Sequence, residues 1–157
     1  MKVVFSSKYR YRAFHKPDLG IVTLVSSHLG SEVTGYGSET LWQVALDASN
    51  WNFCDCEFRL TAEGKSGMHR MEPKVVASAI EVEFDWSSAT AIALSYSGRT
   101  LTLSVKAAQS LQWIQLKGSD IVFGFTNDAA LAAIVVDNVV EDPLGLHESE
   151  WLDEIGI

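Results

Sequence analysis

The chain has 157 residues, of which 47% are hydrophobic and 20% are charged. These values are those of one ordinary globular domain covering residues 1–157, and they exclude intrinsic disorder and a need for disulfide or metal cross-links. The formal net charge of −8 argues against nucleic acid and an acidic membrane surface as partners, because both attract clustered Lys and Arg.

An alternation of apolar and polar residues dominates most of the chain and predicts antiparallel strands with one face in water. The pattern is clearest in 80–86, where Glu81, Glu83 and Asp85 alternate with large apolar residues. The Gly- and Ser-rich segment 31–40 is expected to be a loop. In chain order, the candidate strands are KVVFS, GIVTLVS, TLWQVALDA, NFCDCEFRL, AIEVEFDW, ATAIALSY, LTLSVKA, SLQWIQLK and DIVFGFT.

Short connections join several of these strands. The sequence SGRT predicts a hairpin around Ser97 and Gly98, and only Lys117-Gly118-Ser119 separates the last two strands. No alternation of strands with helices suggests a doubly wound fold. We therefore predict a mainly β (β-rich α+β) protein, an antiparallel meander of about eight strands that forms a barrel, sandwich or curved sheet, with one or two short helices in the C-terminal quarter.

The segment 128–140 is ambiguous between helix and strand. Its alanines favour a helix, with Thr126 or Asn127 as the N-cap, whereas the run 134–136 of β-branched residues favours a strand. We interpret the segment as a helix that Pro143 ends.

The last segment, HESEWLDEI at 147–155, predicts a short amphipathic helix. Trp151, Leu152 and Ile155 would lie on one face and the acidic residues on the other.

No motif predicts a catalytic residue, a metal site or a cofactor. Cys54 and Cys56 have no second Cys or His pair to converge with. Their spacing on a strand places both on the same apolar face as Phe58, so both are expected to be buried in the core. The GKS at 64–66 lacks the earlier Gly of a phosphate loop, since Arg59 stands at that position. The four His residues are scattered along the sequence. The three alternating acids of 81–85 indicate a strand face exposed to water.

Charge is distributed unevenly along the chain. Residues 1–16 hold five basic residues and no acid, and residues 1–117 together carry 12 basic and 11 acidic residues. Residues 118–157 carry nine acidic residues and no basic one. We expect the basic N-terminal segment KYRYRAFHK to balance the acidic end or to protect an edge strand, in preference to binding single-stranded nucleic acid.

The acidic C-terminal segment is the candidate partner-binding surface. Acidic surfaces accelerate association with basic proteins, and an aromatic residue ringed by charge is typical of binding hot spots. The candidate residues are Glu148, Glu150, Trp151, Asp153 and Glu154. We therefore predict a small acidic binding protein that docks a basic protein partner. In composition only, it resembles inhibitors such as the immunity proteins that neutralise basic nucleases.

Alternatives to this hypothesis stay open. A closed barrel would suit a small apolar ligand, and an enzyme site assembled only in space would leave no sequence motif. The C-terminal helix could also pack against the sheet with its acids merely solvated. Because the N-terminal apolar run ends at Ser6 and no segment approaches the ~20 apolar residues of a membrane span, a cytoplasmic location is expected.

Overall fold

The computed structural model describes residues 1–28, 32–37, 42–60, 75–86, 93–105 and 111–155. Two six-stranded sheets have the orders β14-β2-β3-β6-β5-β4 and β7-β11-β12-β13-β10-β9, and β1 and β8 form a two-stranded sheet. The strands are β1 (Lys2–Ser6), β2 (Tyr11–Lys16), β3 (Ile21–Ser26), β4 (Glu32–Gly37), β5 (Trp42–Asp47), β6 (Phe53–Arg59), β7 (Val75–Ala79), β8 (Glu81–Asp85), β9 (Ala93–Ser97), β10 (Thr100–Ser104), β11 (Gln112–Leu116), β12 (Ile121–Phe125), β13 (Leu131–Val136) and β14 (Val140–Glu141). A 3-10 turn, η1 (Pro17–Leu19), and one helix, α1 (Leu146–Glu154), complete the described part.

The mainly β fold predicted from the sequence is confirmed, and most strand pairs are antiparallel. The exceptions are the parallel pairs β7–β11 and β14–β2. The strands exceed the predicted number of about eight, and their order departs from a simple meander, because β6 lies beside β3 and β13 beside β10. Within the described residues neither six-stranded sheet closes into a barrel, since β14 and β4 end one sheet and β7 and β9 the other.

A cluster of aromatic rings packs in the main core. Phe5 of β1 lies at its centre, with ring centroids 4.5 Å from Phe53 of β6, 5.1 Å from Phe123 of β12 and 6.0 Å from Phe84 of β8. These four side chains come from all three sheets, and none is more than 6% exposed. Side chains thus fill the interior in which a barrel would have held an apolar ligand.

Segment 128–140 does not form the helix predicted for it. Residues Leu131–Val136 are strand β13, between β12 and β10, and all six are buried. A central strand with both faces covered shows a continuous apolar run, which periodicity cannot distinguish from a buried helix. Thr126, the expected cap, instead closes the β12–β13 turn, in which its backbone N–H donates to Ala130 O at 2.9 Å.

The hairpin predicted around Ser97 and Gly98 is confirmed. Strands β9 and β10 form the expected hairpin, and Gly98 and Arg99 at its tip have φ values of 58° and 63°. Two consecutive positive φ values define a type I′ turn, which matches the twist of the flanking strands.

Segment 32–37, which was expected to be a loop, is instead strand β4, paired with β5.

Helix α1 confirms the amphipathic segment predicted at the C-terminal end. Its first turn is capped by Asp142, which is buried and accepts hydrogen bonds from the backbone N–H groups of His147 (2.9 Å) and Glu148 (3.0 Å). These bonds satisfy two of the free donors at a helix N-terminus. No helix among the described residues is long and apolar enough to cross a membrane.

Candidate functional site

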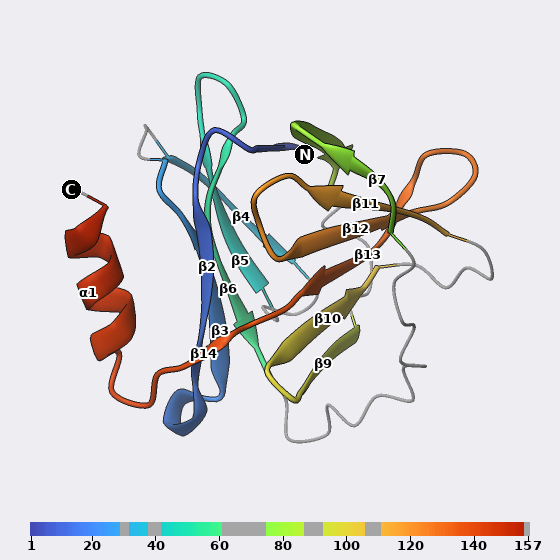
Figure 1. Ribbon diagram of the computed structural model, residues 1–157. Coiled ribbons are helices and arrows are strands. Elements are labelled where there is room, and N and C mark those ends of the chain that lie inside the picture. Colours follow the sequence, from blue (N-terminus) through green and yellow to red (C-terminus); the bar gives the residue numbers. More distant parts are fainter. Residues whose placement is uncertain (29–31, 38–41, 61–74, 87–92, 106–110, 156–157) are drawn as a thin grey trace.

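Helix α1 lies on the outer face of the sheet that contains β2 and β3, on the side away from the second six-stranded sheet (Figure 1). Trp151 is 6% exposed, and its ring centroid is 6.2 Å from that of Phe14 on β2. Glu148 accepts a hydrogen bond from the Thr23 hydroxyl of β3 (2.8 Å) and forms an ion pair with Lys16 of β2 (2.5 Å). One aromatic contact and one short ion pair therefore fix the helix to the sheet.

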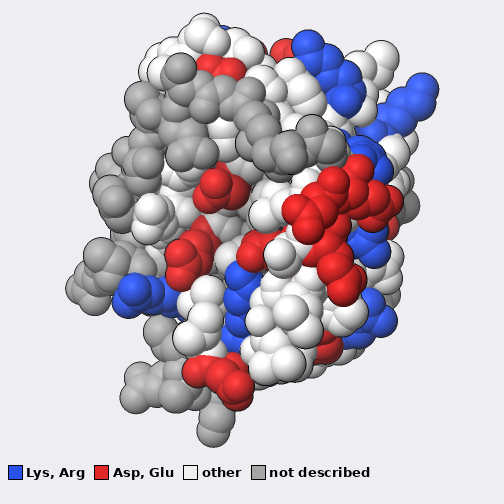
Figure 2. Space-filling model, turned by 90° about the vertical axis from the view of Figure 1, so that its left-hand side faces the viewer, with Lys and Arg blue, Asp and Glu red and all other residues white. Residues whose placement is uncertain are grey.

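The five candidate residues separate into two groups. Trp151 and Glu148 face the sheet, so both anchor the helix, and the indole ring is not at the surface. Glu150, Asp153 and Glu154 are exposed on the outer side. Figure 2 shows acidic side chains gathered on the face of the molecule that carries α1. The ring of charge around an accessible aromatic, which the sequence predicted, is therefore reduced to an acidic outer face.

The position of these acids on the helix is electrostatically unfavourable. The C-terminal end of a helix carries a partial negative charge, so carboxylates there lower stability by about 0.3–1 kcal/mol each where screening is weak. The last turn of α1 includes Asp153 and Glu154 and has no basic residue. Within the described part of the chain, neither takes part in an ion pair. Helix stability does not explain the two acids.

A cavity of about 240 Å³ lies between α1 and the sheet, next to this acidic face. Thr23 of β3 lies opposite Glu57 of β6, and Val25 lies opposite Asp55, so all four side chains belong to neighbouring positions. The lining of the cavity includes Val25, His28, Asp55, Glu57, Glu148 and Leu152. Carboxylates from both β6 and α1 therefore line the cavity, together with apolar side chains from β3 and α1.

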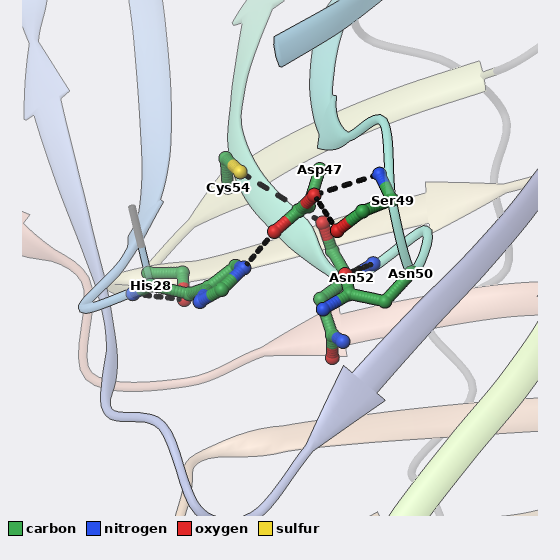
Figure 3. Close-up of polar contacts among 7 residues, drawn as sticks. His28, Asp47, Ser49, Asn50, Asn52 and Cys54 are labelled. Atoms are coloured by element: carbon green, nitrogen blue, oxygen red, sulfur yellow. Dashed lines mark hydrogen bonds and ion pairs between the residues drawn. The ribbon is translucent and has the colours of Figure 1, made fainter. Parts of the chain in front are cut away.

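His28, which lines the cavity, is hydrogen-bonded to Asp47 (Figure 3). His28 Nε2 is 2.6 Å from Asp47 Oδ2, and the side chains of the two residues are 12% and 7% exposed. Asp47 Oδ1 accepts from the backbone N–H of Ser49 (2.8 Å) and from its hydroxyl (2.7 Å). The Tyr9 ring packs on the imidazole, with centroids 4.4 Å apart. The ring of His28 is thus held in one orientation from two sides.

Hydrogen bonds from Ser49, followed by the one from His28, lower the pKa of Asp47 to about 2 from an ordinary value of 3.8. Because the folded-state pKa is the lower one, the ionised carboxylate stabilises the fold fully above about pH 4, and this stabilisation is lost as the pH falls toward 2. We expect the difference in unfolding free energy between wild type and Asp47→Asn to shrink from pH 5 to pH 2. Urea unfolding at pH 5, 3.5 and 2.5 measures it.

Asp18→Asn provides the control for this pH series, because Asp18 is an exposed carboxylate in η1. Its difference from wild type should stay nearly constant over the same range. A difference for Asp47→Asn that is equally constant would contradict the role of Asp47.

Both cysteines are buried, as predicted, but they do not share a face. Phe53 and Asp55 pair with Leu46 and Ala45, so Cys54 is the extra residue of a β-bulge. Phe53 and Cys56 therefore point into the main core. Burial raises the pKa of the Cys56 thiol, which disfavours the reactive thiolate. Among the described residues, no group of three His, Cys, Asp or Glu side chains could hold a metal ion.

A second His–carboxylate pair lies within one six-stranded sheet, and Tyr96 links it to the other. His15 Nδ1 of β2 is 2.7 Å from Glu141 Oε2 of β14, and the Tyr96 hydroxyl of β9 donates to the other oxygen of Glu141. The hydrogen bond from Tyr96 is the main cause that lowers the pKa of Glu141. Sequence reasoning missed both His–carboxylate pairs, because their members are 126 and 19 residues apart and no motif links them.

Three further sequence features are the acidic row at 81–85, the basic N-terminal segment and the GKS segment. Glu81, Glu83 and Asp85 form an exposed row on β8, and Glu83 and Asp85 pair with Lys2 and with the N-terminal amine. The basic N-terminal segment contributes Lys16 to the ion pair with Glu148, as charge balance predicted. The GKS segment lies outside the described residues.

Comparison with protein-family models and with curated proteins finds no match.

Proposed function

We propose that the protein is a binding protein that docks a basic protein partner on the outer face of α1. The observation that carries this proposal is the pair of exposed acids, Asp153 and Glu154, in a last helical turn with no basic residue. They are costly for the helix and available to a partner. An inhibitor of the immunity type, which neutralises a basic enzyme, would use such a surface.

Electrostatics favour a basic partner over other classes. The C-terminal quarter of the chain carries nine acids and no basic residue, and Figure 2 shows acids exposed on the face that carries α1. Complementary charge raises association rates and penalises acidic competitors. Within the described residues neither six-stranded sheet closes into the barrel that an apolar ligand would require, and three carboxylates, Asp55, Glu57 and Glu148, are among the residues that line the cavity beside α1.

Reversal of the exposed charges tests the proposal. The basic partner is first captured on immobilised wild-type protein and then purified. The variant E150K/D153K/E154K should bind this partner at least tenfold more weakly than wild type does. Lysines there repel the partner and also suit the helix dipole, so the fold should survive. Surface plasmon resonance at 50 and 300 mM salt measures both the affinity and its dependence on screening.

The variant E81K/E83K/D120K is the matched control, because it changes net charge equally at three exposed positions outside α1. It should keep most of the affinity. Equal loss in the two variants would show an effect of net charge alone, and unchanged binding by E150K/D153K/E154K would refute docking on α1.

A further inference from the structure

We infer that an exposed apolar patch at the start of α1 forms the centre of the docking face, and that the basic partner packs apolar side chains on it. The patch consists of Leu19, Leu144 and Leu146. This inference rests on the proposed function, because it names what the same partner must carry besides basic residues. Protein interfaces combine an apolar centre with a polar or charged rim, and the exposed acids of α1 supply only the rim.

Exposed apolar side chains are concentrated at this end of the molecule. Five large apolar side chains are exposed among the described residues, and three of them form the patch: Leu19 (70%), Leu144 (77%) and Leu146 (58%). The ion pair between Lys16 Nζ and Glu148 Oε2, at 2.5 Å, joins the two segments that carry them. Leu19 follows Lys16 by three residues, and Leu146 precedes Glu148 by two. Single exposed apolar residues are common, whereas neighbouring ones mark interaction sites.

The turn that carries Leu144 has a fixed backbone. Gly145 has a φ of 72°, and its N–H donates to Asp142 O at 3.2 Å. The buried Asp142 carboxylate in turn accepts from the backbone N–H groups of His147 and Glu148. Because these contacts already order the turn, a partner that covers Leu144 has little backbone entropy to remove.

Helical spacing places the patch and the exposed acids on one side of α1. Leu146, Glu150 and Asp153 stand at i, i+4 and i+7, so their side chains leave the same side of the helix. Trp151 packs on Phe14 from the other side. In Figure 2 an uncharged surface adjoins the group of acids on the face that carries α1. The outward side of α1 is therefore apolar where the helix begins and acidic where it ends.

This order defines the chemistry of the partner. At 1.5 Å per residue, Leu146 and Asp153 lie about 10 Å apart along the helix axis. Glu150 lies between them, and its carboxylate is 3.9 Å from His147 Nδ1, which is too long for a hydrogen bond. A matching partner presents apolar side chains about 10 Å from its Lys or Arg residues. An amphipathic helix with leucines in one half and lysines about two turns away has this arrangement.

Titration with a synthetic peptide of this design, followed by two-dimensional NMR, tests the patch. Leucines occupy one half of the peptide and lysines the other, and alanine fills the remaining positions. We expect chemical-shift changes at the amides of Leu144, Leu146 and Asp153 in wild type. The variant L144S/L146S should bind the peptide at least tenfold more weakly, the ratio that corresponds to losing the burial of a leucine side chain. A peptide with serine in place of its leucines should bind wild type equally weakly.

Ile80→Ser is the matched control, because Ile80 is 69% exposed and lies between β7 and β8, outside the patch. It should bind the peptide as wild type does. Hydrogen exchange at 147–155 should be the same in L144S/L146S as in wild type, since both leucines are exposed. Leu144→Ser changes a residue outside α1 and should by itself weaken binding about threefold. This single variant decides the outcome if the double variant loosens the helix.

Equal binding of the peptide by wild type and L144S/L146S, or no shift at 144–153 in wild type, would overturn the inference. The proposed function fails separately. If E150K/D153K/E154K keeps the captured partner while L144S/L146S binds the peptide more weakly, the acidic docking face is wrong and the apolar patch stands. If L144S/L146S binds the captured partner as well as wild type does while E150K/D153K/E154K does not, the apolar patch is wrong and the docking face stands.

Discussion

The Phe5→Ala variant should lose about 3–5 kcal/mol of unfolding free energy, the usual cost of truncating a buried phenylalanine. Phe5 is fully buried, and its ring contacts Phe53, Phe84 and Phe123 from the other parts of the core. The substitution leaves a void where the three sheets meet, and the surrounding rings are too large to close it. Urea unfolding followed by tryptophan fluorescence measures the change.

At this chain length such a loss corresponds to a fall in Tm of about 6–20 °C. Ile80→Ala is the control, because Ile80 is apolar but 69% exposed. It should change stability by less than about 0.5 kcal/mol. If the two variants were equally stable, the aromatic cluster would not be the principal core.

The Trp151→Ala variant should release α1 from the sheet. Trp151 is the buried residue of the helix, and its loss should remove about 3–5 kcal/mol of docking energy. A nine-residue helix is not stable by itself in water, so it should unfold locally. Hydrogen exchange should then show loss of protection at 147–155, whereas the amides of β12 and β13 keep theirs.

Local release distinguishes this variant from Phe5→Ala. Trp151 lies outside the main core cluster, so the unfolding of the two large sheets should shift much less than in Phe5→Ala. Leu146→Ala is the control within the helix, since Leu146 is 58% exposed. Retained protection at 147–155 in Trp151→Ala would show that Glu148 and its partners suffice to hold the helix.

Most of the strands could be predicted because local sequence determines them. One face of β8 is exposed to water and the other is buried. The strand therefore alternates exposed Glu81, Glu83 and Asp85 with buried Val82 and Phe84. Strand β13 could not be assigned in this way, because both of its faces are buried and no alternation remains. The strand order could not be predicted either, since the β3–β6 and β10–β13 pairs depend on contacts between distant segments.

The candidate site was predictable only in part. The spacing of Trp151, Leu152 and Ile155 indicated an amphipathic helix, and the acidic composition of its outer side followed directly. Which of its residues were accessible depended on the sheet beneath, where Phe14 covers Trp151 and Lys16 binds Glu148. The cavity also escaped prediction, because its lining combines β3, β6 and α1.

Hydrogen exchange on the complex with the captured basic partner tests the docking face most directly. We expect docking on α1 to slow exchange at the amides of 146–155 and to leave those of β8 and β9 unchanged. Protection confined to the second six-stranded sheet or to β8, with α1 exchanging as in the free protein, would contradict it.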